Sequence, residues 1–151
     1  FMQSFVNMKV NQDSHIKKKY IPDFAIDWLY GKVQKQIDKI NKIGKAFLYF
    51  QPFENIYEKA EKAKQVISLN TQFGEGWLIA GEMSSFASQG INHVISLQPF
   101  GCIANHIVEK GIEKRIKSVY PQINILSLDF DSSVSDVNII NRLLLFVDNI
   151  K

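Results

Sequence analysis

Two short apolar runs, separated by a helical pattern, constrain the fold of this chain more than any other feature of its sequence. The runs are His93–Leu97 and Ile123–Leu128, and both are rich in Val, Ile and Leu. Helices are predicted over residues 105–119, between the runs, and 135–149, after the second run. Two strands with one helix between them favour parallel pairing through a right-handed crossover. The sequence therefore predicts an α/β fold with part of a doubly wound parallel sheet, built on a βαβα unit.

Neither apolar run alternates regularly between polar and apolar residues. Such a pattern is typical of strands that are covered on both faces. We therefore expect the helices that follow Cys102 and Ser135 to pack against the sheet.

The N-terminal half is predicted to add helices to this sheet. Asp23 is expected to cap a long helix, and Gly44 to end it with a positive φ. Two further helices are predicted over residues 55–67 and 77–89. Five residues of the long helix are expected to share one apolar face, directed at the core or at a partner: Phe24, Trp28, Val33, Ile37 and Ile40.

The first fourteen residues lack a clear hydrophobic period, because Phe, Val and Met are mixed with Asn, Gln and Ser. We interpret residues 1–22 as an irregular N-terminal arm and residues 23–151 as a single α/β domain. Because the chain begins at Phe1, with Met2 behind it, we expect it to be the C-terminal fragment of a larger protein.

Composition excludes several classes of protein. The 151 residues are 46% hydrophobic and 22% charged, which is enough for a core without disulfides. A net charge of +3, with Lys17–Lys19 as the only basic run, indicates no basic surface that would bind nucleic acid. The longest apolar run, Leu143–Val147, is far too short to cross a membrane. The single cysteine and the lack of a signal peptide favour a cytoplasmic location.

Ligands of open parallel sheets bind beyond the carboxyl ends of the strands, so the loop after the first run is a candidate site. It contains Cys102, with Asn105 and His106 following at the start of the predicted helix. Helix N–H groups favour a thiolate at such a position, which suits a nucleophile or a metal ligand. The alternative is a buried cysteine that packs as a small hydrophobe, with His106 on the helix surface. Cys102 and His106 alone are too few ligands for zinc.

The loop after the second run carries two carboxylates, Asp129 and Asp131. Their spacing is compatible with cation binding or with acid and base catalysis. The better interpretation is turn and capping chemistry, because Asp and Ser satisfy free backbone groups at a helix start.

Three stretches of the chain resemble a known family: GEGWLIAGEM, QPFGCIANHIVEKGI and YPQINILSLDFDSSVSDVNIINRL. From about Ile56 onward the chain is similar to the C-terminal region of the acyl-CoA dehydratase activase-related proteins. These bacterial proteins join activase-like domains to a region similar to 2-hydroxyacyl-CoA dehydratase subunits. The family usually has Pro where Ala104 stands and Pro-Gly where Ser132 and Ser133 stand, which puts the detail of two turns in doubt.

The resemblance implies a role in electron transfer linked to 2-hydroxyacyl-CoA dehydration. In this family an ATP-driven [4Fe–4S] activase reduces a dehydratase, whose own [4Fe–4S] cluster is held by cysteines from separate segments. By analogy, Cys102 is one ligand of a shared cluster in the full-length protein. Upstream domains of the same chain, or a dehydratase-like subunit, would supply the others. The isolated fragment is expected to bind no cluster and to be inactive.

Two other functions stay open from the residues themselves. The chain is otherwise a structural or interaction domain without its own chemistry, or a thiol enzyme in which His106 acts as the base for Cys102. The thiol enzyme ranks last, because no third group is evident to orient the histidine. Self-association into a homo-oligomer is also left as an alternative.

Overall fold

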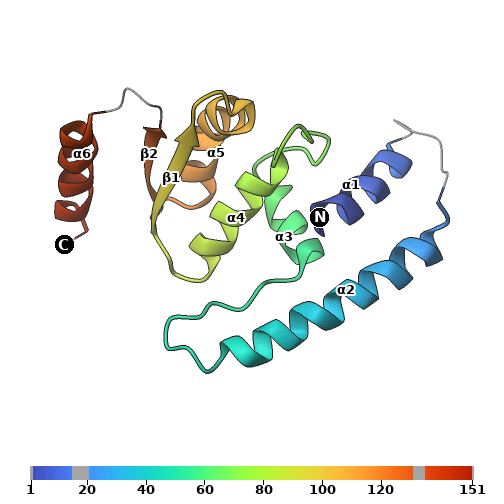
Figure 1. Cartoon of the computed structure of the whole chain (residues 1–151). Helices are drawn as coiled ribbons and strands as arrows, with labels where there is room; N and C mark the ends of the chain where they lie inside the picture. Colours follow the sequence, from blue (N-terminus) through green and yellow to red (C-terminus); the bar gives the residue numbers. More distant parts are fainter. Residues whose placement is uncertain (1, 15–20, 131–134, 151) are drawn as a thin grey trace.

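The computed structural model describes residues 2–14, 21–130 and 135–150, and it shows a mixed α/β chain in which helices predominate (Figure 1). The described elements, in chain order, are α1 Met2–Asp13, α2 Asp23–Gly44, α3 Ile56–Ala63, α4 Trp77–Ser88, β1 His93–Pro99, the π-helix η1 Ala104–Glu109, α5 Lys110–Val119, β2 Asn124–Phe130 and α6 Asp136–Asp148.

Both apolar runs form strands, and they pair in parallel as the sequence predicts. The register runs from His93 opposite Asn124 to Pro99 opposite Phe130. Within the described residues the sheet has these two strands alone. The prediction of parallel α/β pairing is thus confirmed, while the doubly wound sheet stays a prediction.

Helices cover one face of the sheet much better than the other. The helices α4, η1 and α5 lie against one side, where Val94 of β1 joins Ile112 and Ile116 of α5 in the core. On β1, however, Ile95 and Leu97 keep 45% and 53% of their surface exposed. The expectation that both runs are covered on both faces is therefore wrong for β1.

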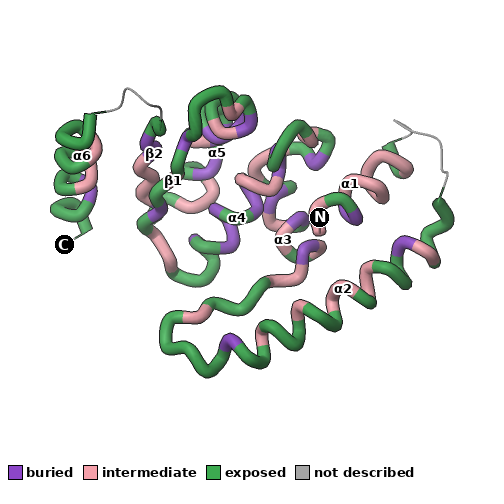
Figure 2. The backbone as a smooth tube through the Cα atoms, in the orientation of Figure 1, coloured by how far each residue is buried: buried purple, intermediate pink, exposed green. Residues whose placement is uncertain are grey.

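The last helix, α6, lies beyond β2, on the side away from α4 and α5 (Figure 1). Arg142 and Phe146 connect this helix to the strands. Arg142 donates from a guanidinium nitrogen to the Ser127 carbonyl oxygen at 2.6 Å, and the buried ring of Phe146 packs edge-on against His93. Leu144 and Leu145 are exposed, so α6 leaves much of its apolar surface uncovered (Figure 2).

The interpretation of residues 1–22 as irregular is wrong for most of that segment, because Met2–Asp13 form α1. Phe5 and Val6 are buried, and Val10 packs against the core one turn after Val6. The indole nitrogen of Trp77, a fully buried residue of α4, donates to Asn7 Oδ1 at 2.8 Å. Polar Asn and Gln residues between the contacts hide this helix from a periodicity test. Residues 15–20 lie outside the described part of the chain.

The long helix α2 begins and ends differently from the prediction. Pro22 holds the N-cap position without a side-chain hydrogen bond, and Asp23 is the first helical residue. Gly44 does not adopt a positive φ. The residue that caps the helix is Lys45, which has right-handed helical geometry. Gly44 is required for space instead, since the Phe50 ring occupies the position that a Cβ would take.

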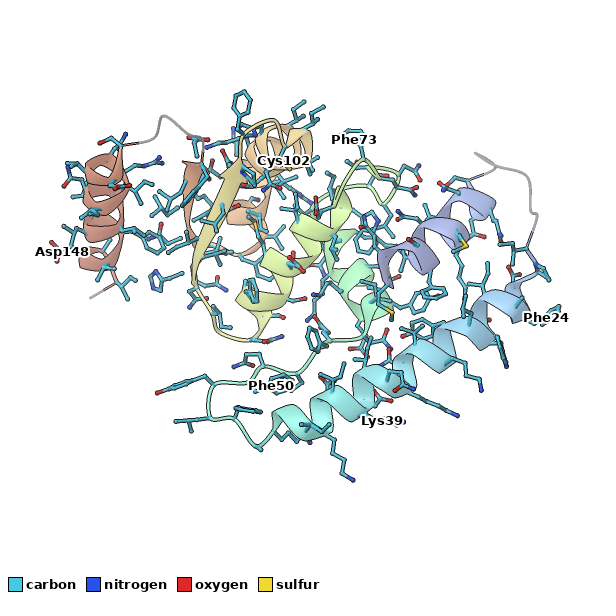
Figure 3. The ribbon with its side chains drawn as sticks, viewed as in Figure 1. Phe24, Lys39, Phe50, Phe73, Cys102 and Asp148 are labelled. Carbon is cyan, nitrogen blue, oxygen red and sulfur yellow. The ribbon has the colours of Figure 1, made fainter. Side chains whose placement is uncertain are left out.

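The predicted apolar face of α2 is split between two sides of the helix. Ile26 is buried and Val33 is half-buried, whereas Phe24 and Trp28 are 76% and 66% exposed. Val33 lies five positions after Trp28, and a step of that size crosses to the other side of an α-helix. Figure 3 shows Phe24 at the outer end of α2, directed away from the rest of the protein.

Candidate functional site

The turn that carries Cys102 is built at the carboxyl end of β1. Phe100 and Gly101 form the turn, and Gly101 has a φ of +76° that favours glycine. The backbone N–H of Cys102 donates to the Pro99 carbonyl at 3.1 Å, and that of Phe100 to the Phe130 carbonyl of β2 at 2.9 Å. Cys102 therefore lies at a strand-to-helix turn on the carboxyl edge of the sheet, as predicted (Figure 3).

A π-helix follows the turn, where the sequence predicts a regular helix. Residues Ala104–Glu109 form η1, and α5 continues from Lys110 to Val119. Short π-helical segments are rare and are often found at functional sites. The predicted helix is thus present, but its first part has a wider turn than an α-helix.

The thiol of Cys102 is partly accessible in an apolar hollow. The side chain is half-buried, and no described residue forms a disulfide or a hydrogen bond with its sulfur. Phe100, Ile103 and Ile107 line the hollow together with His106, and Phe100 is 85% exposed. A sulfur in this position can bind a soft metal centre that approaches from outside the chain.

Asn105 and His106 hold this turn against the two strand ends. The Asn105 amide nitrogen donates to the Leu97 carbonyl oxygen at 2.6 Å. His106 Nδ1 lies 2.9 Å from the Cys102 carbonyl oxygen, a geometry in which Nδ1 carries the ring proton and donates. His106 Nε2 lies 3.7 Å from Asp129 Oδ1 at the end of β2. The start of η1 therefore lies beside the carboxyl end of β2, while residues 131–134 lie outside the described part of the chain.

This geometry does not arrange a catalytic pair. The His106 nitrogens face the Cys102 carbonyl and Asp129, and no hydrogen bond joins the ring to the thiol. Asp131, the second carboxylate of the predicted acidic turn, lies outside the described residues. Among the residues that are described, no three His, Cys, Asp or Glu side chains gather as a metal site.

A buried carboxylate that was not predicted from the sequence lies behind the turn. Glu109, the last residue of η1, is 2% exposed and faces the sheet. It accepts hydrogen bonds from Ser96 Oγ at 2.5 Å, Gln98 Nε2 at 2.9 Å and Ser127 Oγ at 2.6 Å. Ser96 and Gln98 are polar residues two apart in a mostly apolar strand, but this local pattern does not identify the group that they bind. The network ties η1 to both strands beneath Cys102.

Comparisons of the chain with protein-family models, with curated proteins and with solved structures found no match. The resemblance to the activase-related proteins therefore stays a prediction. Within the described residues, no helix has the length and apolar character needed to cross a membrane.

Proposed function

We propose that this chain contributes one thiolate, that of Cys102, to a [4Fe–4S] cluster of a larger protein related to the 2-hydroxyacyl-CoA dehydratases and their activases. The observation that carries the proposal is the position of Cys102, half-buried at the carboxyl end of β1 with its sulfur unbonded by the described residues. The resemblance of the QPFGC segment to the family supports the same assignment.

The surroundings of Cys102 suit a cluster ligand better than a nucleophile. A cubane cluster is normally held by four thiolates, and the sequence contains one cysteine. The other ligands therefore come from upstream domains or from a dehydratase-like subunit. The exposed apolar side chains of Phe100, Ile103 and Ile107 would pack against that second part and exclude water from the cluster.

Asn105, His106 and Glu109 are positioning residues in this proposal. Asn105 and Glu109 link η1 to the strands, and His106 fixes the carbonyl of the cysteine rather than its thiol. A turn anchored in this way keeps the sulfur in one place before the partner arrives. When bound, the cluster would supply the one-electron transfer that accompanies 2-hydroxyacyl-CoA dehydration.

The iron and acid-labile sulfide content of the anaerobically purified full-length protein tests the proposal. Cys102→Ala should reduce the content of both to less than half of the wild-type value, because one of four ligands is lost. Lys110→Ala, which changes an exposed residue of the same connection, is the matched control and should retain both. Unchanged iron in Cys102→Ala, with the circular dichroism spectrum preserved in both variants, would refute the ligand role.

An interaction domain without chemistry is the second candidate. It is favoured by the exposed apolar residues of two helices, Phe24 and Trp28 in α2 and Leu144 and Leu145 in α6. Large apolar residues that gather at a surface commonly mark an interface. The same experiment separates the two functions, because an interaction domain predicts equal iron content in Cys102→Ala and Lys110→Ala.

A further inference from the structure

The outer edge of β1 has no strand beside it among the described residues. In a parallel ladder, the backbone groups of alternate residues point to the same neighbour. The Asn92 carbonyl and the Phe100 N–H bind β2, so the even-numbered residues of β1 direct their backbone groups toward that strand. Ile95 and Leu97 must then direct theirs away from it. The Asn105 side chain indeed reaches the Leu97 carbonyl from the outer side.

Most of this edge lacks the features that usually protect an exposed strand, although Asn105 covers the Leu97 carbonyl. Natural edge strands are commonly guarded by lysine, by proline or by a covering side chain. The other edge of the sheet has such a cover, since Arg142 binds the Ser127 carbonyl. On β1, Ile95 and Leu97 are about half exposed, and Pro99 guards only the end. The stretch from His93 to the Leu97 N–H is therefore open to pairing.

A groove runs along this open edge, between β1 and α4. Its wall on the helix side is formed by Ile79, Glu82 and Phe86 of α4, with Glu75 in the turn that precedes the helix. Acidic and apolar side chains alternate along this wall. Glu82 has one distant partner, Lys59 at 3.7 Å, and no described cation pairs with the Glu75 carboxylate.

The spacing of these side chains is close to that of an extended chain. Within α4, Ile79, Glu82 and Phe86 are roughly 4.5 to 6 Å apart along the helix axis, at a rise of about 1.5 Å per residue. Side chains on one face of a strand are about 6.6 Å apart. A strand beside β1 would thus present successive side chains of one face to Glu75, Ile79, Glu82 and Phe86 in turn.

We propose that the outer edge of β1 binds an extended segment in which basic and apolar side chains alternate along the face that meets α4. The segment would add a third strand through the outward backbone groups of His93 and Ile95 and the N–H of Leu97, and its basic side chains would pair with Glu75 and Glu82. A second copy of this chain fits less well, because it would bring its own Glu75 and Glu82 toward the same edge. The proposal does not depend on a cluster at Cys102.

Amide hydrogen exchange of the chain tests the free edge first. The amides of Ile95 and Leu97 should exchange faster than those of Val94 and Ser96, which face β2. Slow exchange of Ile95 and Leu97 in a monomer would contradict the proposal. Protection that appears together with a dimer in sedimentation would assign the edge to a second copy and also overturn it.

Peptide binding tests the occupant, with fluorescence anisotropy as the readout. The probe is a labelled peptide of about nine residues with blocked termini, in which Lys and Val alternate on one face and Thr occupies the other. The control is an otherwise identical peptide with Glu in place of Lys. The basic peptide should bind and slow the exchange of the Ile95 amide. The Glu75→Gln/Glu82→Gln variant should bind it roughly three- to thirtyfold more weakly, the effect of losing two exposed ion pairs.

A proline substitution separates edge pairing from simple charge attraction. Ile95→Pro removes an outward N–H, a change that edge strands tolerate, and should abolish binding, whereas the matched variant Ile95→Val should retain it. Equal binding to Ile95→Pro, or equal binding of the basic and acidic peptides, would refute the proposal. If Ile95→Pro does not fold, the Glu75→Gln/Glu82→Gln variant and the two peptides still decide the question.

Discussion

Replacing Glu109 with alanine removes the acceptor that Ser96, Gln98 and Ser127 share. Each hydrogen bond to a charged group contributes roughly 1.5 to 3 kcal/mol, so three give about 5 to 9 kcal/mol before the cost of burial. Burying the carboxylate costs several kcal/mol, which leaves an expected loss of about 3 to 5 kcal/mol for Glu109→Ala. Glu109→Gln keeps the shape and one acceptor oxygen, and should cost about 1 to 2 kcal/mol.

Urea unfolding, followed by circular dichroism and by the fluorescence of the buried Trp77, measures these differences. A double-mutant cycle isolates the network, since Ser127→Ala should cost about 1 to 2 kcal/mol less in the Glu109→Ala background than in the wild type. A loss below about 1 kcal/mol for Glu109→Ala, or strict additivity with Ser127→Ala, would refute the argument that the network ties η1 to the sheet. If Glu109→Ala does not fold, Glu109→Gln supplies the same cycle.

Two further predictions concern stability. Gly76 has a φ of +45°, and a Cβ there would collide with the Thr71 carbonyl, so Gly76→Ala should lower the free energy of unfolding, measured in urea, by about 2 to 3 kcal/mol. The control is Gly31→Ala, in open space on α2, which should raise the free energy of unfolding by up to about 1 kcal/mol. Equal effects of the two substitutions would contradict the reasoning. Burial would raise the pKa of Glu54, but hydrogen bonds from Lys62 and Ser85 outweigh it and hold that pKa below its usual value. The contribution of Glu54 to the free energy of unfolding is therefore present above the unfolded pKa, near 4.3, and is lost as pH falls through the folded value. Glu54→Gln should therefore make the free energy of unfolding fall less steeply at acidic pH. An unchanged dependence on pH would contradict this.

The sequence predicted the sheet because its signals are local. His93–Leu97 and Ile123–Leu128 are short apolar runs bounded by turn residues, and Gly90 and Gly101 adopt the positive φ that such turns require. The position of Cys102 followed from the same boundaries. These features depend on neighbours within a few residues, and a pattern test can detect them.

The features that were missed depend on contacts distant in the chain. The helix α1 is fixed by Trp77, seventy residues away, which binds Asn7. Glu109 is recognisable as a network centre only once the register brings Ser127 beside Ser96. The requirement for Gly44 comes from the Phe50 ring rather than from the helix end itself. Local patterns carry no information about these partners.

The central claim, that Cys102 is a cluster ligand, is tested most directly by Mössbauer spectroscopy of the ⁵⁷Fe-labelled full-length protein with Cys102→Ser. Serine keeps the size of the side chain but offers oxygen to one iron of the cubane, which is otherwise held by thiolates. We predict that one iron site of four acquires a distinct, higher isomer shift, or that the cluster is lost, while Lys110→Ala gives the wild-type spectrum. A complete cluster in Cys102→Ser, with the wild-type spectrum at all four sites, would contradict the assignment of Cys102 as a ligand.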